Sequence, residues 1–185
     1  MSDFTAIKAV TETLQQLLVT DLAIAVETKK APHEISASTP LVGLFLYRAE
    51  FNSFLANLDW QKAASTQLIA PPFGLNLQYL VTPYGPDQIE IQKTLGEVMR
   101  AFHEHGVVSA GDPALSPDLA TMTEELRIVP HPLPLSDMIE LWKSFEKVPY
   151  RLAATYEVSA VLIDSRITRN VMPVQERHVD LSTIR

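Results

Sequence analysis

The segment from Leu141 to Ser165 constrains the fold more than any other part of the chain. After a helical stretch and a turn at Pro149, residues alternate between two faces from Tyr150 to Ile163. A single strand of that length, at ~3.3 Å per residue, would reach roughly 50 Å, whereas a typical strand has about 5–6 residues. The alternation therefore predicts either a strand interrupted by a β-bulge or a strand that projects beyond its domain and pairs with another chain.

The rest of the chain alternates between helical and extended patterns. Apolar spacing predicts helices over residues 3–20, 87–105 and 136–146, with Asp87 and Ser136 as N-caps and Gly106 as a C-cap. Strands are predicted over residues 22–27, 41–48, 73–82 and 124–129. Because residues 73–82 present one apolar and one polar face, they suit an antiparallel or mixed sheet. We therefore expect an α+β fold, with helices packed on a mixed, largely antiparallel sheet.

The long segment 50–72 and two proline-containing segments allow further predictions. Residues 50–72 mix aromatic side chains with Asn and Asp, which predicts a long ordered loop with at most one helical turn. Such a loop exposes aromatic side chains, Trp60 among them, unless they pack on a partner. The prolines in residues 83–86 should end the preceding strand, and those in residues 130–134 should exclude both helix and central strand.

Composition excludes several classes of function. The 185 residues, 46% hydrophobic and 20% charged, suit one soluble globular domain. A net charge of -7 argues against nucleic-acid binding, and no apolar run approaches the ~20 residues that span a bilayer, so we expect no direct membrane contact. The absence of cysteine excludes disulfides and thiolate chemistry, and it suits assembly in a reducing cytoplasm.

The charge is unevenly divided between a body, residues 1–165, and a C-terminal tail, residues 166–185. The tail carries four arginines and two acidic residues, a net +2, so the body carries -9; the arginines are Arg166, Arg169, Arg177 and Arg185. Two interpretations stay open. The tail either docks on an acidic neighbour, including another copy of this chain, or is a solvated terminus.

No motif for catalysis, for a cofactor or for a metal is present. Only six glycines occur, and none forms a phosphate-binding or dinucleotide-binding pattern. His103 and His105 stand two positions apart, which places them on different sides of a helix rather than on one metal. Acidic residues are plentiful but scattered. The sequence therefore predicts neither an enzyme nor a cofactor-binding protein.

Two arginines adjoin tyrosines at strand ends, and they are candidates for a role between subunits. Arg48 follows Tyr47, and Arg151 follows Tyr150. A half-buried arginine must be paired, because an isolated charge in an apolar site is costly. The partner is either an internal carboxylate or a group across an interface, where Arg and Tyr are enriched. Trp142, by contrast, is expected in the core.

An ordered set of short motifs resembles one known family. The motifs are Leu46-Tyr47-Arg48, residues 77–85, Leu95-Gly96, Leu141-Trp142, Pro149-Tyr150-Arg151-Leu152 and Ile163-Asp164-Ser165. Over roughly residues 5–165 the chain resembles the N-terminal domain of tail-terminator (cap) proteins of extracellular contractile injection systems, which are phage-tail-like particles. The resemblance implies a phage tail-terminator-like fold for residues 1–165.

The resemblance also implies a function and partners. Such proteins look like hexameric caps that close the inner tube and fasten the last ring of the sheath. The expected partners are five further copies of this chain and the sheath and tube proteins, without any cofactor. Two alternatives remain from the residues themselves: a monomeric adaptor that binds a partner through its C-terminal tail, and an acid/base enzyme built on scattered carboxylates.

Overall fold

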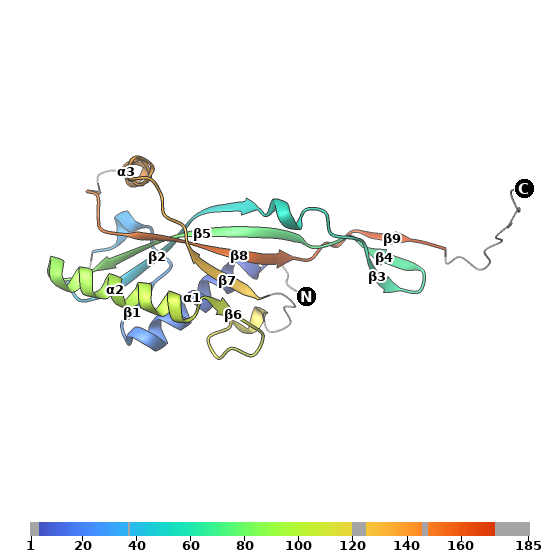
Figure 1. The fold of residues 1–185 in the computed structure, drawn as a ribbon, viewed down its shortest axis with the longest axis horizontal. Coiled ribbons are helices and arrows are strands. Elements are labelled where there is room, and N and C mark those ends of the chain that lie inside the picture. Colours follow the sequence, from blue (N-terminus) through green and yellow to red (C-terminus); the bar gives the residue numbers. More distant parts are fainter. Residues whose placement is uncertain (1–3, 37, 120–124, 146–147, 173–185) are drawn as a thin grey trace, which may run out of the picture.

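The computed structural model describes residues 4–36, 38–119, 125–145 and 148–172, which form a twisted six-stranded sheet with helices on both faces (Figure 1). The strand order is β1-β2-β5-β8-β7-β6, and only the β1–β2 pair is parallel. The strands are β1 (Ala25–Glu27), β2 (Leu41–Phe51), β5 (Phe73–Tyr84), β6 (Val107–Val108), β7 (Leu126–Pro130) and β8 (Ala154–Ile163). The predicted α+β fold with a mixed, largely antiparallel sheet is confirmed.

Two long helices cover one face of the sheet and enclose the main core. α1 (Ala6–Leu22) and α2 (Gln88–Glu104) bury apolar stripes against Leu77, Tyr79 and Val81 of β5. As predicted, Asp87 caps α2, because its carboxylate accepts hydrogen bonds from the amides of Ile89 and Glu90. His105, rather than Gly106, is the C-cap.

A third helix covers the opposite face, which the alternation of residues 73–82 predicts to be polar. α3 (Leu135–Ser144) buries Met138 and Trp142 against Leu80, together with the following Phe145. The expectation of a wet face is therefore wrong at this end of β5, where Thr82 is also buried. The predicted core position of Trp142 is confirmed, with its side chain 2% exposed.

The details of α3 differ from the prediction in two respects. Pro134, not Ser136, is the N-cap, and the Ser136 hydroxyl donates to Asp137 instead of capping the helix. Ile139, expected in the core, is exposed. The helix begins at Leu135, directly after Pro134, whose ring restricts φ, and it turns Met138 and Trp142 rather than Ile139 toward the sheet.

The long final strand contains the predicted bulge, and it also leaves the main sheet. Leu75 pairs with Val161 and Leu77 pairs with Val158. Two steps along β5 therefore correspond to three steps along β8, which carries one extra residue between Val158 and Val161. The extra residue shifts the alternation, and Val161 faces the core although simple alternation places it on the other side. Past Ile163 the chain runs on into a second, smaller sheet (Figure 1).

The proline expectations hold to within two residues, whereas one loop expectation is wrong. β5 includes Pro83, which pairs with Val42, but it ends at Tyr84, inside residues 83–86. β7 ends at Pro130, which pairs with Tyr156, and residues 131–134 belong to no helix or strand. Within residues 50–72 the expected helical turn exists at Ser53–Leu55, but residues 61–69 form the hairpin β3 (Gln61–Ala64) and β4 (Gln67–Ile69) rather than a loop. A hairpin with weak apolar character carries little periodic signal, which explains the miss.

Two glycines provide a matched test of how the turn at Ser53–Leu55 packs against β5. A Cβ added at Gly74 of β5 would lie 2.6–2.9 Å from atoms of Leu55, whereas a Cβ added at Gly96 of α2 would meet nothing within 4 Å. We expect Gly74→Ala to lower the free energy of unfolding by roughly 1–3 kcal/mol through overpacking. Gly96→Ala should raise it by about 0.5–1 kcal/mol, because alanine favours the helix.

Chemical denaturation of both variants and the parent chain measures the difference. A Gly74→Ala protein as stable as the Gly96→Ala protein would show that Leu55 does not hold the turn at Ser53–Leu55 against β5.

Candidate functional site

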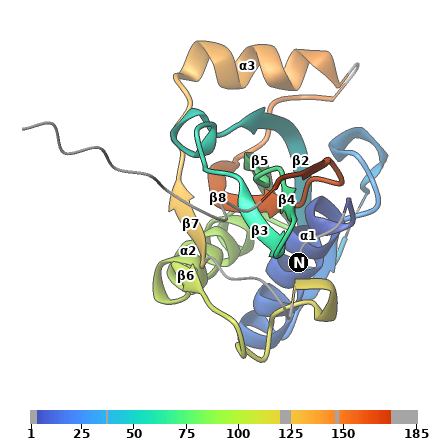
Figure 2. The same ribbon diagram turned by 90° about the vertical axis from the view of Figure 1, so that its right-hand side faces the viewer.

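The most distinctive surface is a three-stranded arm that projects from one end of the main sheet (Figures 1 and 2). Its strand order is β3-β4-β9, with β9 formed by Thr168–Asn170. Segments about a hundred residues apart in the chain are thus joined, since Leu68 pairs with Arg169. The backbone amides of Ala70 and Val171 extend the pairing by donating to the carbonyls of Ile167 and Thr66, at 2.8 and 2.9 Å.

The arm has no hydrophobic core of its own. Every side chain of β3 and β9 is exposed and those of β4 are only half-buried. Apolar side chains beside the arm stay in solvent, with Ile167 at 64% and Met172 at 96% exposure. A small sheet without a buried face is marginal in water. The arm therefore has the properties of a segment that is completed by another molecule.

The predicted site residues of the C-terminal tail fall partly on this arm. Arg169 lies on β9 with its side chain exposed, and Arg166 lies between β8 and β9. Arg177 and Arg185 lie outside the described residues. Trp60, immediately before β3, is 42% exposed, in line with the expectation that it is available to a partner. The structure thus brings Trp60 and Arg169 to the same projecting element.

A row of hydrogen-bonded polar groups links β2, β5 and β8 within the main sheet. The carboxylate of Glu157 in β8 accepts hydrogen bonds from the side-chain amides of Asn76 and Gln78 at 3.1 and 3.2 Å, and the imidazole of His131 lies 3.9 Å from this carboxylate. The side-chain amide of Gln78 also donates to Glu50 of β2 at 3.4 Å. The row fixes these three strands to one another.

Arg48 belongs to this row and has an internal partner. Its guanidinium forms an ion pair with Glu50, so the internal alternative applies to this arginine. The pair is about half exposed, and its effect on stability is therefore small. The neighbouring Tyr47 is the extra residue of a bulge in β2, and burial raises the pKa of its phenol above the ordinary value.

Arg151 has a different environment. Its guanidinium lies over the ring of Tyr84, 5.1 Å from the centroid, and its Nε atom is buried without a hydrogen-bond partner among the described residues. No carboxylate of the described chain forms an ion pair with it. The side chain lines a pocket of about 380 Å³ with Pro83, Ile91 and the half-exposed Tyr150. Among the described residues the arginine is thus held against an aromatic ring.

The described residues offer little for metal or membrane binding. Within them no three His, Asp or Glu side chains lie together as a metal site, and His105 instead lies 3.1 Å from Asp21. None of the helices in the described segments is long and apolar enough to cross a membrane.

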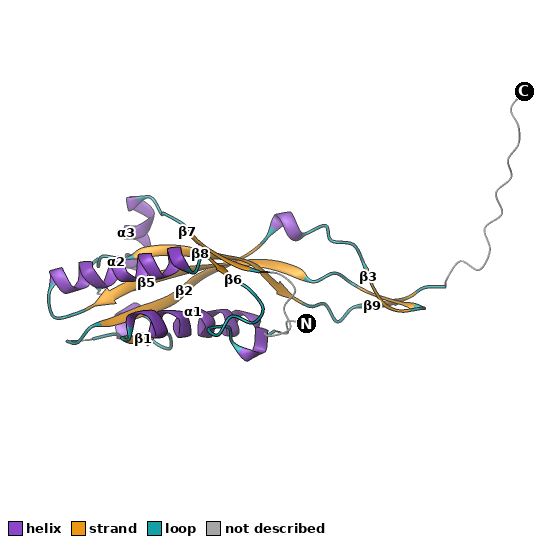
Figure 3. Ribbon diagram, turned by 60° about the horizontal axis from the view of Figure 1, so that its bottom comes forward, coloured by secondary structure: helices purple, strands orange, loops and turns teal. Residues whose placement is uncertain are grey.

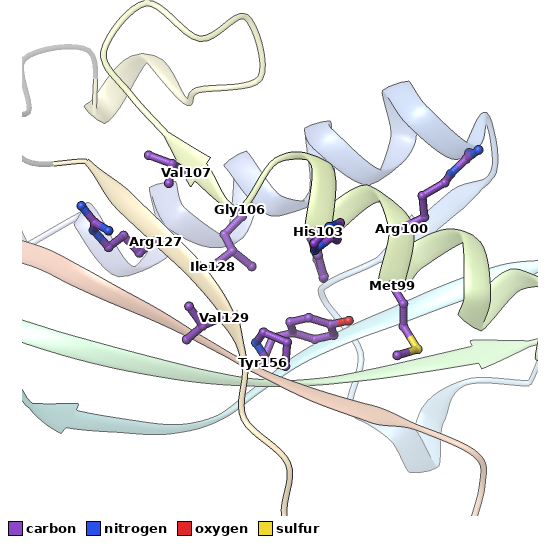
Figure 4. Close-up of a pocket in the computed structure, with 11 residues that line it drawn as sticks. Met99, Arg100, His103, Gly106, Val107, Arg127, Ile128, Val129 and Tyr156 are labelled. Carbon is purple, nitrogen blue, oxygen red and sulfur yellow. The ribbon is translucent and has the colours of Figure 1, made fainter.

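A further surface was not predicted from the sequence: an open groove between α2 and β7 (Figure 4). It has a volume of about 650 Å³ and an apolar floor that includes Phe102, Ile128 and Tyr156. The phenol of Tyr156 has a raised pKa because it is buried there. The lining residues come from four separate elements, α2, β6, β7 and β8, so no local sequence pattern marks the groove.

The fold of the described residues, a curled and mostly antiparallel sheet with helices packed on it, matches solved structures of terminators of contractile injection particles. The cryo-EM structure of an extracellular contractile injection system sheath/tube terminator, PVC in its extended state, matches with a TM-score of 0.70 and 16% identity. The tube-terminating cap of the anti-feeding prophage matches with a TM-score of 0.66 and 17% identity.

The chain belongs to the Pvc16 N-terminal domain family, whose model matches residues 9–177. No curated protein sequence matches the chain. The two structural matches cover 97% and 93% of this chain but only 64% and 60% of the respective terminators. The chain therefore spans about three fifths of the length of these structural relatives.

The lack of a core in the arm predicts its hydrogen-exchange behaviour. In the isolated chain we expect the free energy of local opening at the β4 and β9 amides to be about 0 kcal/mol, as it is for exposed loops. The central amides of β5 should approach the global free energy of unfolding, about 5–15 kcal/mol. Exchange measured by mass spectrometry checks this, and an arm as protected as β5 would contradict the claim that it lacks its own support.

Proposed function

We propose that this chain is a structural cap that terminates the tube and sheath of a contractile, phage-tail-like injection particle. The observation that carries the proposal is the arm, since a sheet of three short strands without a buried face requires another molecule to bury it. Membership of the Pvc16 N-terminal domain family and the fold shared with two terminators support the same role.

The proposed assembly is a ring of six copies bound to sheath and tube proteins. A ring needs two different complementary patches on each subunit. The acidic body and the basic arm residue Arg169 are one such pair of patches. Exposed edges of β3 and β9 are suited to strand addition by a neighbouring protein.

The proposal assigns no catalytic residue, cofactor or nucleic acid to the chain. The polar row around Glu157 serves to hold strands β2, β5 and β8 in register. The chain would be present in the cytoplasm during assembly and would then become part of the particle. Truncation of the tail distinguishes a cap from a monomeric adaptor that binds a partner through its tail.

Two truncations test whether the arm or the end of the tail makes the attachment. We expect the chain ending at Met172, which keeps β9, to attach to sheath-bearing particles nearly as well as the full chain. The chain ending at Ser165 loses β9 and should attach at least tenfold less, because β4 loses its partner strand. Cosedimentation with particles assembled without the endogenous cap measures attachment, and circular dichroism confirms that both variants fold.

The contrary results are distinct. Full attachment of the chain ending at Ser165 would overturn the role of the arm. Equal loss from both truncations would instead assign attachment to residues 173–185, as the adaptor hypothesis requires.

Arg151 provides an independent test of subunit contact. We expect Arg151→Ala to cost at most about 1 kcal/mol of stability, since its polar contact among the described residues is a cation–π contact with Tyr84. Association of subunits, followed by sedimentation velocity, should weaken by about tenfold or more. Arg151→Lys should recover part of the association, because lysine keeps the charge but not the planar donor geometry.

Arg48→Ala is the matched control, because its exposed ion pair predicts little change in either measurement. A large fall in melting temperature of Arg151→Ala with association intact would place this arginine in an internal bridge.

A further inference from the structure

A chain of side-chain hydrogen bonds runs from the polar row of the main sheet to the turn that leads into the arm. The side-chain amide of Asn76 donates to the Glu157 carboxylate at 3.1 Å, and the side-chain amide of Asn52 donates to the side-chain oxygen of Asn76 at 2.9 Å. The side-chain oxygen of Asn52 then accepts from the backbone amide of Phe54 at 3.0 Å, which caps the helical turn at Ser53–Leu55. We call Glu157, Asn76 and Asn52 the relay.

The relay has one direction, because its first member only accepts hydrogen bonds. An ionised carboxylate has no proton to donate, whereas a side-chain amide has a donor end and an acceptor end. Glu157 therefore requires Asn76 to present its NH2 group, which leaves the oxygen of Asn76 for Asn52. Asn52 must in turn present its own NH2 group, which leaves its oxygen for the amide of Phe54. The charge of Glu157 thus decides which end of Asn52 faces the turn.

The surroundings of Glu157 hold its carboxylate in place. The second carboxylate oxygen accepts from the side-chain amide of Gln78 at 3.2 Å and lies 3.9 Å from the imidazole of His131, and the side chain is 18% exposed. The same amide of Gln78 also donates to the carboxylate of Glu50. Among the described residues Glu50 forms no side-chain hydrogen bond with the two asparagines, so Glu157 alone sets the direction of the relay.

The turn at the end of the relay has few other anchors. Within residues 52–60, which connect β2 to β3, only Asn52 and Leu55 are half-buried and the others are exposed. Leu55 packs over Gly74, and the backbone amide of Asn52 donates to the Gly74 carbonyl at 2.8 Å. Figure 3 shows the short helical turn where the chain passes from the main sheet to the arm. Because Trp60 and β3 follow in the chain, the turn sets where the first strand of the arm begins.

We propose that Glu157 is a positioning residue for the arm. Through the relay it fixes the turn at Ser53–Leu55 and thereby the placement of Trp60 and β3 for a partner. Glu157 acts through the two asparagines rather than by contact with the partner. The inference rests on the role of the arm in the proposed function, and it adds the residue of the main sheet that orients the arm.

Glu157→Gln tests the relay, because it keeps the shape of the side chain and removes the charge. Glutamine can present either its oxygen or its NH2 group to Asn76, so the relay loses its fixed direction. We expect hydrogen exchange of the Phe54 amide, measured by NMR on the free chain, to become at least tenfold faster. Attachment to sheath-bearing particles, measured by cosedimentation, should fall at least threefold, while circular dichroism shows a folded domain.

An exchange of the acid and the amide separates a directing role from a merely structural one. In the double variant Glu157→Gln with Asn76→Asp, the carboxylate stands at position 76, where it accepts both from the amide at position 157 and from Asn52. We expect at least half of the loss in both measurements to be recovered. Recovery stays incomplete because position 76 lies opposite Glu50 on β2. Asn76→Asp alone places two carboxylates together and should weaken both measurements.

Glu50→Gln is the matched control. Glu50 accepts from the same Gln78 amide as Glu157 does, and its own ion pair with Arg48 is about half exposed. This variant should change neither measurement by more than about twofold. Asn52→Ala, which removes the last member of the relay at a half-buried position, should reproduce both effects of Glu157→Gln, and it keeps the test available if Glu157→Gln does not fold.

The contrary outcomes separate this inference from the proposed function. Unchanged exchange at Phe54 in Glu157→Gln, or no recovery in the double variant, would overturn the directing role of Glu157 whatever the particle does. Faster exchange with full attachment would overturn the positioning of the arm and leave the cap intact. A parent chain that does not attach to particles would overturn the proposed function and the positioning role with it, whereas the relay itself is decided by the exchange measurement.

Discussion

The pairing of β5 with β8 supports every other part of this structure. The two strands run together from Phe73–Ile163 to Val81–Ala154, and their two faces carry the two separate cores. One extra residue in β8 turns Val161 toward the core under α1 and α2. Beyond this pair the chain has no remaining core to cover, and both β4 and β9 extend into solvent as the arm.

The arm links this architecture to assembly. Burial of apolar area is the main favourable term in folding, and the arm obtains almost none of it within one chain. A small sheet of this kind is retained where a second molecule supplies the missing layer.

Periodicity in the sequence predicted the elements that pack on the core and missed those that do not. Helices α1 and α2, the Asp87 cap and the long strands follow from apolar spacing, because burial imposes that spacing. The hairpin β3–β4 buries no side chain fully, so its residues show no such pattern. The prolines mark the strand ends to within two residues, since β5 ends one residue after Pro83 and β7 ends at Pro130. Among site residues, Trp60 and Arg169 were predicted to be available, whereas the groove around Tyr156 depends on tertiary contacts that no local pattern encodes.

The mass of the full chain, measured by native mass spectrometry over a rising concentration series, tests the central claim most directly. The account predicts a closed ring with the mass of six chains, which binds to the end of a tube-and-sheath particle. A chain that stays monomeric at high concentration, and that binds neither sheath nor tube protein, would contradict it.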